Sequence, residues 1–292
     1  MNHLVALLVV IIWGNTFVSS KVLLNAGLMP ADIFLYRFLM AYVIMLAFSH
    51  KRMFARNIKD ELTLAGLGLM GGTLYFLTEN MALSLSTSAN VSILVCTTPL
   101  ITALILSCFY KSERLNVRQV CGSILSFVGV TLIVLNGQLN LHLNPLGDTL
   151  ALSAAVTWAF YSLFMRRIMG KYDNDFITRK VFFYGIVTII PYFLFIEPPH
   201  WEKEILCQTQ VFLNLLFLGV IASSCCYLLW NWVMKVIGTT KSANYLYLQS
   251  LVTMITASIV LDERITWMAI AGVTILLSGM FMAIRNGKRQ PA

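Results

Sequence analysis

Charged side chains are scarce in this sequence. Only 12% of its 292 residues are Asp, Glu, Lys or Arg, whereas 58% are hydrophobic. A soluble domain carries about 25% charged residues, so the chain lacks the charge needed to cover its apolar interior with a water-exposed surface. This shortage excludes an ordinary soluble protein and predicts a polytopic integral membrane protein.

Metal-ligating and disulfide patterns are also missing. All histidines lie at the ends of apolar runs or in loops: His3, His50, His142 and His200. No aspartate lies well inside a run, and the six cysteines show no zinc-type spacing. Because all cysteines except Cys207 fall inside apolar runs, we interpret them as small buried hydrophobic residues. The sequence therefore predicts no metal, no cofactor and no disulfide framework.

Ten apolar runs are long enough to cross a hydrocarbon core of about 30 Å, which takes about 20 residues. They cover residues 4–24, 31–49, 62–83, 88–109, 115–135, 147–166, 178–196, 210–234, 241–261 and 265–284. Backbone polar groups in lipid must be satisfied within the segment unless a barrel closes, and strand-like alternation is absent. The sequence thus predicts an all-α integral membrane protein with ten transmembrane helices.

The basic residues predict the orientation. With ten spans, nearly all Lys and Arg outside the runs fall on one side, and the opposite side receives only Lys203 and Arg264. Basic loops remain in the cytoplasm, so we expect both termini to lie in the cytoplasm. The protein itself is expected in the cytoplasmic (inner) membrane. The net charge of +8 is then explained by contact with anionic lipid, which argues against nucleic acid as a partner.

Two stretches of the chain repeat each other. Ser88-Ala89-Asn90 and Ser242-Ala243-Asn244 open them, and Glu113 and Glu263 lie 150 residues apart. Glycine pairs follow at the same offset: Gly122 and Gly129, then Gly272 and Gly279. Because five spans per half is an odd number, the halves must be inverted relative to each other. We expect two inverted five-helix repeats, residues 1–140 and 141–292, an architecture usual in secondary transporters.

These motifs occur in an order that resembles the EamA-type branch of the drug/metabolite transporter superfamily. The first half carries Trp13-Gly14-Asn15, Pro30, Tyr36-Arg37-Phe38, Met81-Ala82-Leu83, Thr98-Pro99 and Glu113-Arg114-Leu115. The second carries Trp158, Ser242-Ala243 and Glu263-Arg264-Ile265. The sequence departs from the pattern in the ninth run, where Gln249-Ser250-Leu251 replaces an expected proline, and at Ala159, where the first half has Gly14. The resemblance implies a ten-helix carrier of small metabolites, often amino acids or related compounds, and frequently an exporter.

Glu79 is the only acidic side chain well inside a run. Ionisable groups in hydrocarbon are costly and usually face the bundle interior. One interpretation is a structural ion pair with Lys21 or Arg37, which lie at similar depth. The other is a site for a substrate amine or a proton, with Tyr75 one turn away on the same helix face.

Other polar and aromatic residues are candidates for the walls of a substrate pathway. They are Trp13 and Asn15 in the first run, Asn80 in the third, Trp158 and Tyr161 in the sixth, and Tyr245 and Gln249 in the ninth. Core packing and interhelical hydrogen bonds are the competing explanations. Asn231 and Pro99 are candidates for an inner gate and a hinge, whereas Glu113 and Glu263 fit helix N-termini. The glycine pairs predict close helix packing, within a monomer or in a homodimer.

The sequence therefore predicts a secondary transporter, not an enzyme, that moves a small molecule by alternating access. No phosphate-binding motif for ATP is present, so the substrate gradient or protons would supply the energy. Two alternatives remain open, an intramembrane enzyme acting on a lipid and a passive channel or facilitator. The enzyme would need a paired acid and base or metal ligands, which the runs lack.

Overall fold

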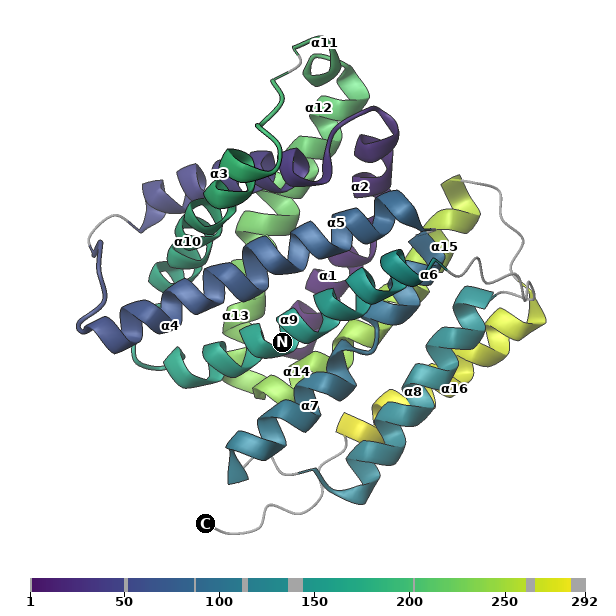
Figure 1. The fold of residues 1–292 in the computed structure, drawn as a ribbon. Coiled ribbons are helices and arrows are strands. Elements are labelled where there is room, and N and C mark those ends of the chain that lie inside the picture. Colours follow the sequence, from purple (N-terminus) through teal and green to yellow (C-terminus); the bar gives the residue numbers. More distant parts are fainter. Residues whose placement is uncertain are drawn as a thin grey trace.

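The computed structural model describes residues 2–49, 52–86, 88–111, 115–135, 144–201, 203–260 and 266–284, and within them the chain forms helices and no strand (Figure 1). The helices up to residue 135 are α1 Asn2–Gly14, α2 Thr16–Asn25, α3 Pro30–Phe48, α4 Ile58–Gly68, η1 Leu69–Leu74, α5 Tyr75–Leu85, α6 Ser88–Val95, α7 Thr98–Phe109 and α8 Val117–Leu135. Those that follow are α9 Pro145–Ile168, α10 Asn174–Phe195, α11 Lys203–Leu206, α12 Thr209–Leu216, η3 Phe217–Cys225, α13 Cys226–Ile237, α14 Thr239–Ala243, η4 Asn244–Tyr247, α15 Leu248–Val260 and α16 Trp267–Ile284.

Among the described residues, six helical segments are long and apolar enough to span a membrane. They are Asn2–Asn25, Pro30–Phe48, Val91–Phe109, Pro145–Ile168, Asn174–Phe195 and Thr209–Ile237. Two shorter apolar helices cover Val117–Ile133 and Trp267–Ala283. The two remaining predicted runs, 62–83 and 241–261, coincide with the consecutive helices α4, η1 and α5 and the consecutive helices α14, η4 and α15.

Local sequence explains where several helices begin. Pro30 and Pro145 occupy the first turns of α3 and α9, where a missing backbone N–H costs nothing. Asn57 and Asn144 cap α4 and α9, and their side-chain oxygens accept hydrogen bonds from the backbone N–H groups of Asp60 and Gly147 over 2.8 and 3.0 Å. These signals lie in the connections between apolar runs, which is why the run boundaries locate the helices well.

Large apolar side chains are exposed on the outer surface of the bundle. Phe48, Phe195 and Trp267 are 77%, 84% and 84% exposed. Many large apolar side chains exposed on one molecule are unfavourable in water. It is the expected surface of a helix bundle in contact with lipid.

The helices α8 and α16 lie side by side at one edge of the bundle (Figure 1). A Cβ atom on Gly122 would lie 2.6 Å from the backbone nitrogen of Ala283 and 2.7 Å from the carbonyl oxygen of Gly279. Gly129 faces Gly272 in the same way, so the two helices are antiparallel and in backbone contact. The glycine pairs thus mark packing between α8 and α16 within one chain.

A polar cluster joins α4 to the connection between α9 and α10. The carboxylate of Asp60 accepts hydrogen bonds from Lys171, Tyr172 and Asn57, each over 3.0 Å. The ammonium of Lys171, followed by the Tyr172 hydroxyl and the Asn57 amide, lowers the pKa of Asp60 below its usual value. Beside it, Lys180 and Tyr184 of α10 donate to the carboxylate of Glu61.

Candidate functional site

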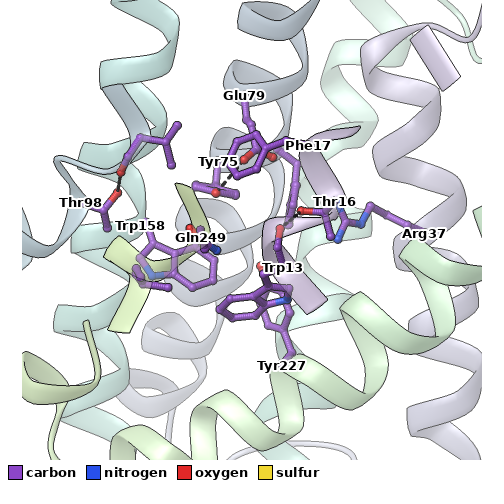
Figure 2. Close-up of a pocket in the computed structure, with 13 residues that line it drawn as sticks. Trp13, Thr16, Phe17, Arg37, Tyr75, Glu79, Thr98, Trp158, Tyr227 and Gln249 are labelled. Carbon is purple, nitrogen blue, oxygen red and sulfur yellow. Dashed lines mark hydrogen bonds between the residues drawn. The ribbon is translucent and has the colours of Figure 1, made fainter. Parts of the chain in front are cut away.

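A cavity near the middle of the bundle has an empty volume of about 450 Å³, part of which is open to solvent. The elements α1, α2, α3, α5, α6, α7, α9, α13, η4 and α15 contribute its walls (Figure 2). The lining residues are Trp13, Thr16, Phe17, Arg37, Tyr75, Phe76, Glu79, Val95, Thr98, Trp158, Tyr227, Leu246 and Gln249. Both halves of the chain therefore contribute to it.

Four of the lining residues flank breaks between consecutive helices. Trp13 and Thr16 flank the break at Asn15 between α1 and α2, and Val95 and Thr98 flank the break between α6 and α7. Such breaks release backbone groups and change the direction of a helix. Substrate sites of membrane carriers are typically formed by discontinuous helices of this kind.

Two π-helical segments lie beside the cavity. Tyr75 and Phe76 follow η1 directly, and Tyr227 follows η3 by two residues. A π-helical turn widens a helix, offsets the side chains that follow it and occurs frequently at functional sites. The two segments therefore help to place these three aromatic rings on the cavity wall.

Glu79 and Tyr75 face the cavity from α5. Glu79 is 4% exposed, and the Tyr75 hydroxyl donates a hydrogen bond of 2.8 Å to its carboxylate (Figure 2). Neither Lys21 nor Arg37, both among the described residues, has a side-chain nitrogen within 4.0 Å of this carboxylate. The expected ion pair is thus not formed. Lys21 instead donates to the carbonyl oxygen of Leu83 over 2.6 Å.

Arg37 lines the cavity from α3. Its Nε donates a hydrogen bond of 3.0 Å to the Ser223 hydroxyl, and its guanidinium carbon lies 4.0 Å from the centre of the Phe76 ring. Its Nη1 is buried and has no hydrogen-bond partner among the described residues. Ser223 therefore binds Nε and Phe76 covers one face of the guanidinium, whereas neither Nη1 nor Nη2 has a hydrogen-bond partner among the described residues.

Four aromatic rings pack around the cavity, and one of them, Trp158, contacts the other three. The ring of Trp158 lies 5.5 Å from Trp13, 4.9 Å from Tyr75 and 5.8 Å from Tyr227. The indole of Trp13 also donates a hydrogen bond of 2.8 Å to the carbonyl of Ala222. Edge-to-face and tilted contacts at these distances are favourable and give the cavity rigid, largely apolar walls.

The break before α7 follows from Pro99. Proline has no backbone N–H for the carbonyl of Val95, one turn earlier. The Thr98 hydroxyl donates to that carbonyl over 2.6 Å instead (Figure 2). Pro99 therefore interrupts the helix at the cavity wall without leaving this carbonyl unpaired, while Thr98 and Val95 line the cavity.

Gln249 is 8% exposed and lines the cavity from α15. Its backbone carbonyl accepts a hydrogen bond from Thr253. Its side-chain amide has no partner among the described residues, so interhelical bonding does not occupy it. The corresponding position on α6, Asn90, lies outside the residues whose side chains are described.

Several predicted residues lie away from the cavity and bond to other helices. Asn15 accepts a hydrogen bond of 2.8 Å from Thr256, and Asn80 donates one of 3.2 Å to the carbonyl of Pro30. Tyr245 pairs with His3 over 2.5 Å. Each of these polar groups thus joins two helices.

Asn231 connects three helices of the second half. Its side-chain oxygen accepts a hydrogen bond of 2.5 Å from Tyr161, and its amide donates one of 3.0 Å to Thr178. Neither Asn231 nor Tyr161 lines the cavity. The two helix-end glutamates, Glu113 and Glu263, lie outside the described residues.

Tyr227 is a cavity residue that the sequence analysis missed. Tyr227 and Asn231 lie four residues apart in the eighth run, as Tyr75 and Glu79 do in the third run, which is its counterpart in the first half. Following the repeat through these two runs would have identified it. No comparable sequence signal marks Thr16, Phe76 or Leu246, because whether these side chains face the cavity depends on how each helix is rotated.

No three His, Cys, Asp or Glu side chains in the described part of the chain are grouped closely enough to hold a metal ion. The site instead offers one carboxylate, one guanidinium, one free amide and aromatic walls. This combination suits reversible binding of a small polar or amphipathic molecule.

Comparison with known families decides the class of protein. A model of the EamA-like transporter family matches residues 1–135 and again residues 145–285. The chain belongs to the EamA-like transporter family. It is thus a multi-pass membrane transporter with a small-molecule substrate, and not an enzyme.

Relatives of this EamA-like chain match it almost from end to end. An "Uncharacterized transporter" of Archaeoglobus fulgidus is 31% identical over 288 residues, with 96% of each chain covered. A "Probable amino-acid metabolite efflux pump" of Escherichia coli is 26% identical, with 97% of this chain and 94% of the relative covered. The protein of the same name from Salmonella typhimurium is 28% identical, with 96% and 93% covered.

A solved crystal structure shares the fold of this EamA-like chain. It aligns over 97% of this chain and 98% of its own, with a TM-score of 0.76. At 17% identity, the likeness concerns the fold alone.

Proposed function

We propose that this chain is a secondary transporter that carries a small metabolite by alternating access, with the central cavity as the binding site. The observation that carries the proposal is that the two halves of the chain form this cavity together, with a buried carboxylate in its wall. Secondary transporters hold their substrate at such an interface near the midplane.

The proposed architecture has ten spans in two inverted five-helix repeats, residues 1–140 and 141–292. Reciprocal packing supports it. α1 packs against α13 and α9 against α5, while η3 packs against α3 and η1 against α10. The second contact of each pair is the first with the halves exchanged: spans one and eight correspond to spans six and three, and spans eight and two to spans three and seven. The antiparallel contact of α8 with α16 and the two separate matches to the family model agree with this arrangement.

We further propose that the protein lies in the cytoplasmic (inner) membrane with both termini in the cytoplasm. The distribution of basic residues supports this orientation. The glycine faces of α8 and α16 are occupied by each other within one chain, which favours a monomer over a homodimer formed through them.

The proposed substrates are amino acids or related compounds, and the proposed direction is export. The names of the relatives from E. coli and S. typhimurium support this choice. Glu79 would select the substrate or couple its transport to protons, since it is the only acidic residue among the described residues that line the cavity. Tyr75, Trp13, Trp158 and Gln249 would contact the substrate, whereas Asn15, Asn80, Tyr161, Tyr245, Lys21 and Asn231 would hold the helices in place.

Contacts between the two halves of the chain lie near the cavity on both proposed sides of the membrane. Hydrogen bonds join the halves towards the proposed cytoplasmic side, from Tyr227 to the carbonyl of Gly71. On the proposed outer side, His200 contacts Asp32 over 3.2 Å.

Uptake into proteoliposomes tests the proposal. Purified protein should be reconstituted and supplied with a panel of labelled amino acids, nucleosides and sugars, with Glu79→Gln protein as a matched sample. We expect faster uptake of one or more amino acids than in empty liposomes, and slower uptake with Glu79→Gln. Uptake of every solute at the rate of empty liposomes would contradict the proposal.

A further inference from the structure

Arg37 carries a buried charge that the protein satisfies only in part. The side chain is 1% exposed, and Ser223 is the only acceptor of its hydrogen bonds among the described residues. Its Nη1 is buried without a partner. A buried charged donor without an acceptor is strongly unfavourable. An acceptor supplied by a ligand would remove this penalty.

The surroundings of Arg37 hold the guanidinium in one orientation. Ser223 binds Nε, and the ring of Phe76 covers one face at 4.0 Å. In Figure 2 the side chain reaches toward Thr16 and the cavity. The fork of a guanidinium matches a carboxylate in a bidentate pair, and a guanidinium that is already fixed loses little entropy on binding.

Glu79 provides the opposite charge in the same cavity. It accepts a hydrogen bond from Tyr75 and forms no ion pair with Arg37 within 4.0 Å. The cavity therefore contains one cation and one anion that do not neutralise each other by contact. A ligand that carries both charges on one small unit complements this pair.

We propose that the cavity recognises the zwitterionic head of an α-amino acid, with the substrate carboxylate on Nη1 of Arg37 and its ammonium on Glu79. This inference rests on the proposed carrier function and names the chemical class of its substrate. Arg37 then determines specificity, and not merely the packing of the helices.

The remaining lining residues define the side chain that the substrate carries. Besides Arg37 and Glu79, the described residues of the cavity wall are neutral, among them the rings of Trp13, Trp158 and Tyr227. A second charge on the substrate would be buried without a counter-ion, which is costly. The site therefore favours neutral amino acids over lysine and glutamate.

The first test uses the wild-type protein. Proteoliposomes transporting labelled leucine should be challenged with unlabelled leucine, with its decarboxylated amine (3-methylbutylamine) and with its deaminated acid (4-methylpentanoate). Loss of one partner of a buried charge pair weakens binding at least about tenfold. We expect leucine to compete at least about tenfold better than either analogue. Equal competition by all three would overturn the inference while leaving the carrier function intact.

The second test changes the selectivity. Arg37→Gln should weaken the competition of unlabelled leucine with labelled leucine at least about tenfold. The competition of the amine with the remaining uptake of labelled leucine should stay at its wild-type strength. Glu79→Gln should also weaken competition by leucine, but competition by the deaminated acid should stay at its wild-type strength. A purely structural role of Arg37 would lower competition by leucine and the amine alike, which is the contrary outcome.

Controls separate folding from recognition. Lys21→Gln removes a cation that donates to the backbone carbonyls of Leu83 and Ser86, and it should keep the wild-type ratio of leucine to amine. If Arg37→Gln protein fails gel filtration, Arg37→Lys retains the charge without the fork and should give an intermediate ratio. If wild-type protein transports no solute, the carrier function itself has failed, a result distinct from loss of selectivity.

Discussion

The hydroxyl of Tyr75 donates a hydrogen bond of 2.8 Å to the carboxylate of Glu79, one helical turn further along α5. Both side chains face the same cavity. Because Tyr75 is neutral, it positions the carboxylate without cancelling its charge. The only acidic residue of the cavity wall therefore remains available to a substrate cation or a proton.

Replacing Glu79 should affect transport more than replacing Tyr75. We expect Glu79→Gln to lower the transport rate at low substrate concentration at least about tenfold and to abolish its dependence on pH in the physiological range. Tyr75→Phe keeps the ring and removes one hydrogen bond to a charged group, so a smaller loss is expected. Initial uptake rates measure both. Glu204→Gln, on an exposed residue of α11, is the control, and unchanged transport in Glu79→Gln at every pH would refute a role for this carboxylate.

The polar cluster around Asp60 predicts a specific dependence of stability on pH. Hydrogen bonding by Lys171 holds the pKa of Asp60 below its usual value, which is about 3.9 in an unfolded chain. The ionised carboxylate therefore stabilises the folded state at neutral pH, and this contribution is lost as the pH falls below about 4. Asp60→Asn should lower the unfolding temperature by about 2–4 °C at neutral pH, and the difference should shrink in acid.

Thermal unfolding of detergent-solubilised protein checks this prediction. Asp173→Asn changes an exposed carboxylate on the connection that carries Lys171 and should have little effect at any pH. A difference between wild type and Asp60→Asn that stays constant from neutral to acid pH would show that ionisation of Asp60 does not stabilise the fold.

The contact between α8 and α16 leaves no room for a side chain at Gly122. A new Cβ atom would lie 2.6 Å from the backbone nitrogen of Ala283, so the helices would have to separate. Gly122→Ala should cost about 1–3 kcal/mol of stability, as overpacking does elsewhere. Thermal unfolding is the measurement. Ile124→Ala, at a position of α8 that is 50% exposed, is the control, and equal unfolding temperatures for the two variants would argue against this packing.

Cys207 offers a direct test of the proposed orientation. It is exposed between α11 and α12, on the side that we assign to the exterior. In a variant in which the other five cysteines are replaced, a membrane-impermeant maleimide should label Cys207 in intact cells. Lys235→Cys, at an exposed position near the end of α13, should be labelled only after lysis in a background without other cysteines. The reverse pattern would place both termini outside.

The helices were predictable because apolar runs and their boundaries are local features of the sequence. The run 31–49 corresponds to α3 at Pro30–Phe48, and the run 115–135 to α8 at Val117–Leu135. The π-helical segments η1 and η3 were not anticipated. Gly71-Gly72 in the first segment and Ser223-Ser224 in the second favour an irregular helix, but such pairs do not specify a π-helical segment.

Residues of the candidate site were predictable only where the residue type is unfavourable or unusual deep in the membrane. Glu79 could be identified because a carboxylate in hydrocarbon is expensive, and tryptophans far from the interface marked Trp13 and Trp158. Asn15 and Asn80 are equally polar, yet they bond to Thr256 and to the carbonyl of Pro30 away from the cavity. The hydrogen-bond partners of a polar side chain depend on tertiary packing, which cannot be predicted from composition and spacing.

Counterflow tests the central claim, that the cavity alternates between the two sides of the membrane, most directly. Proteoliposomes should be preloaded with unlabelled substrate, and the initial entry of labelled substrate should be compared with that into vesicles without substrate inside. A carrier returns to the outer side faster when it is loaded, so we predict faster entry and a transient accumulation of label above equilibrium. Entry at the same rate in both kinds of vesicle, with no accumulation, would indicate a pore and contradict the account.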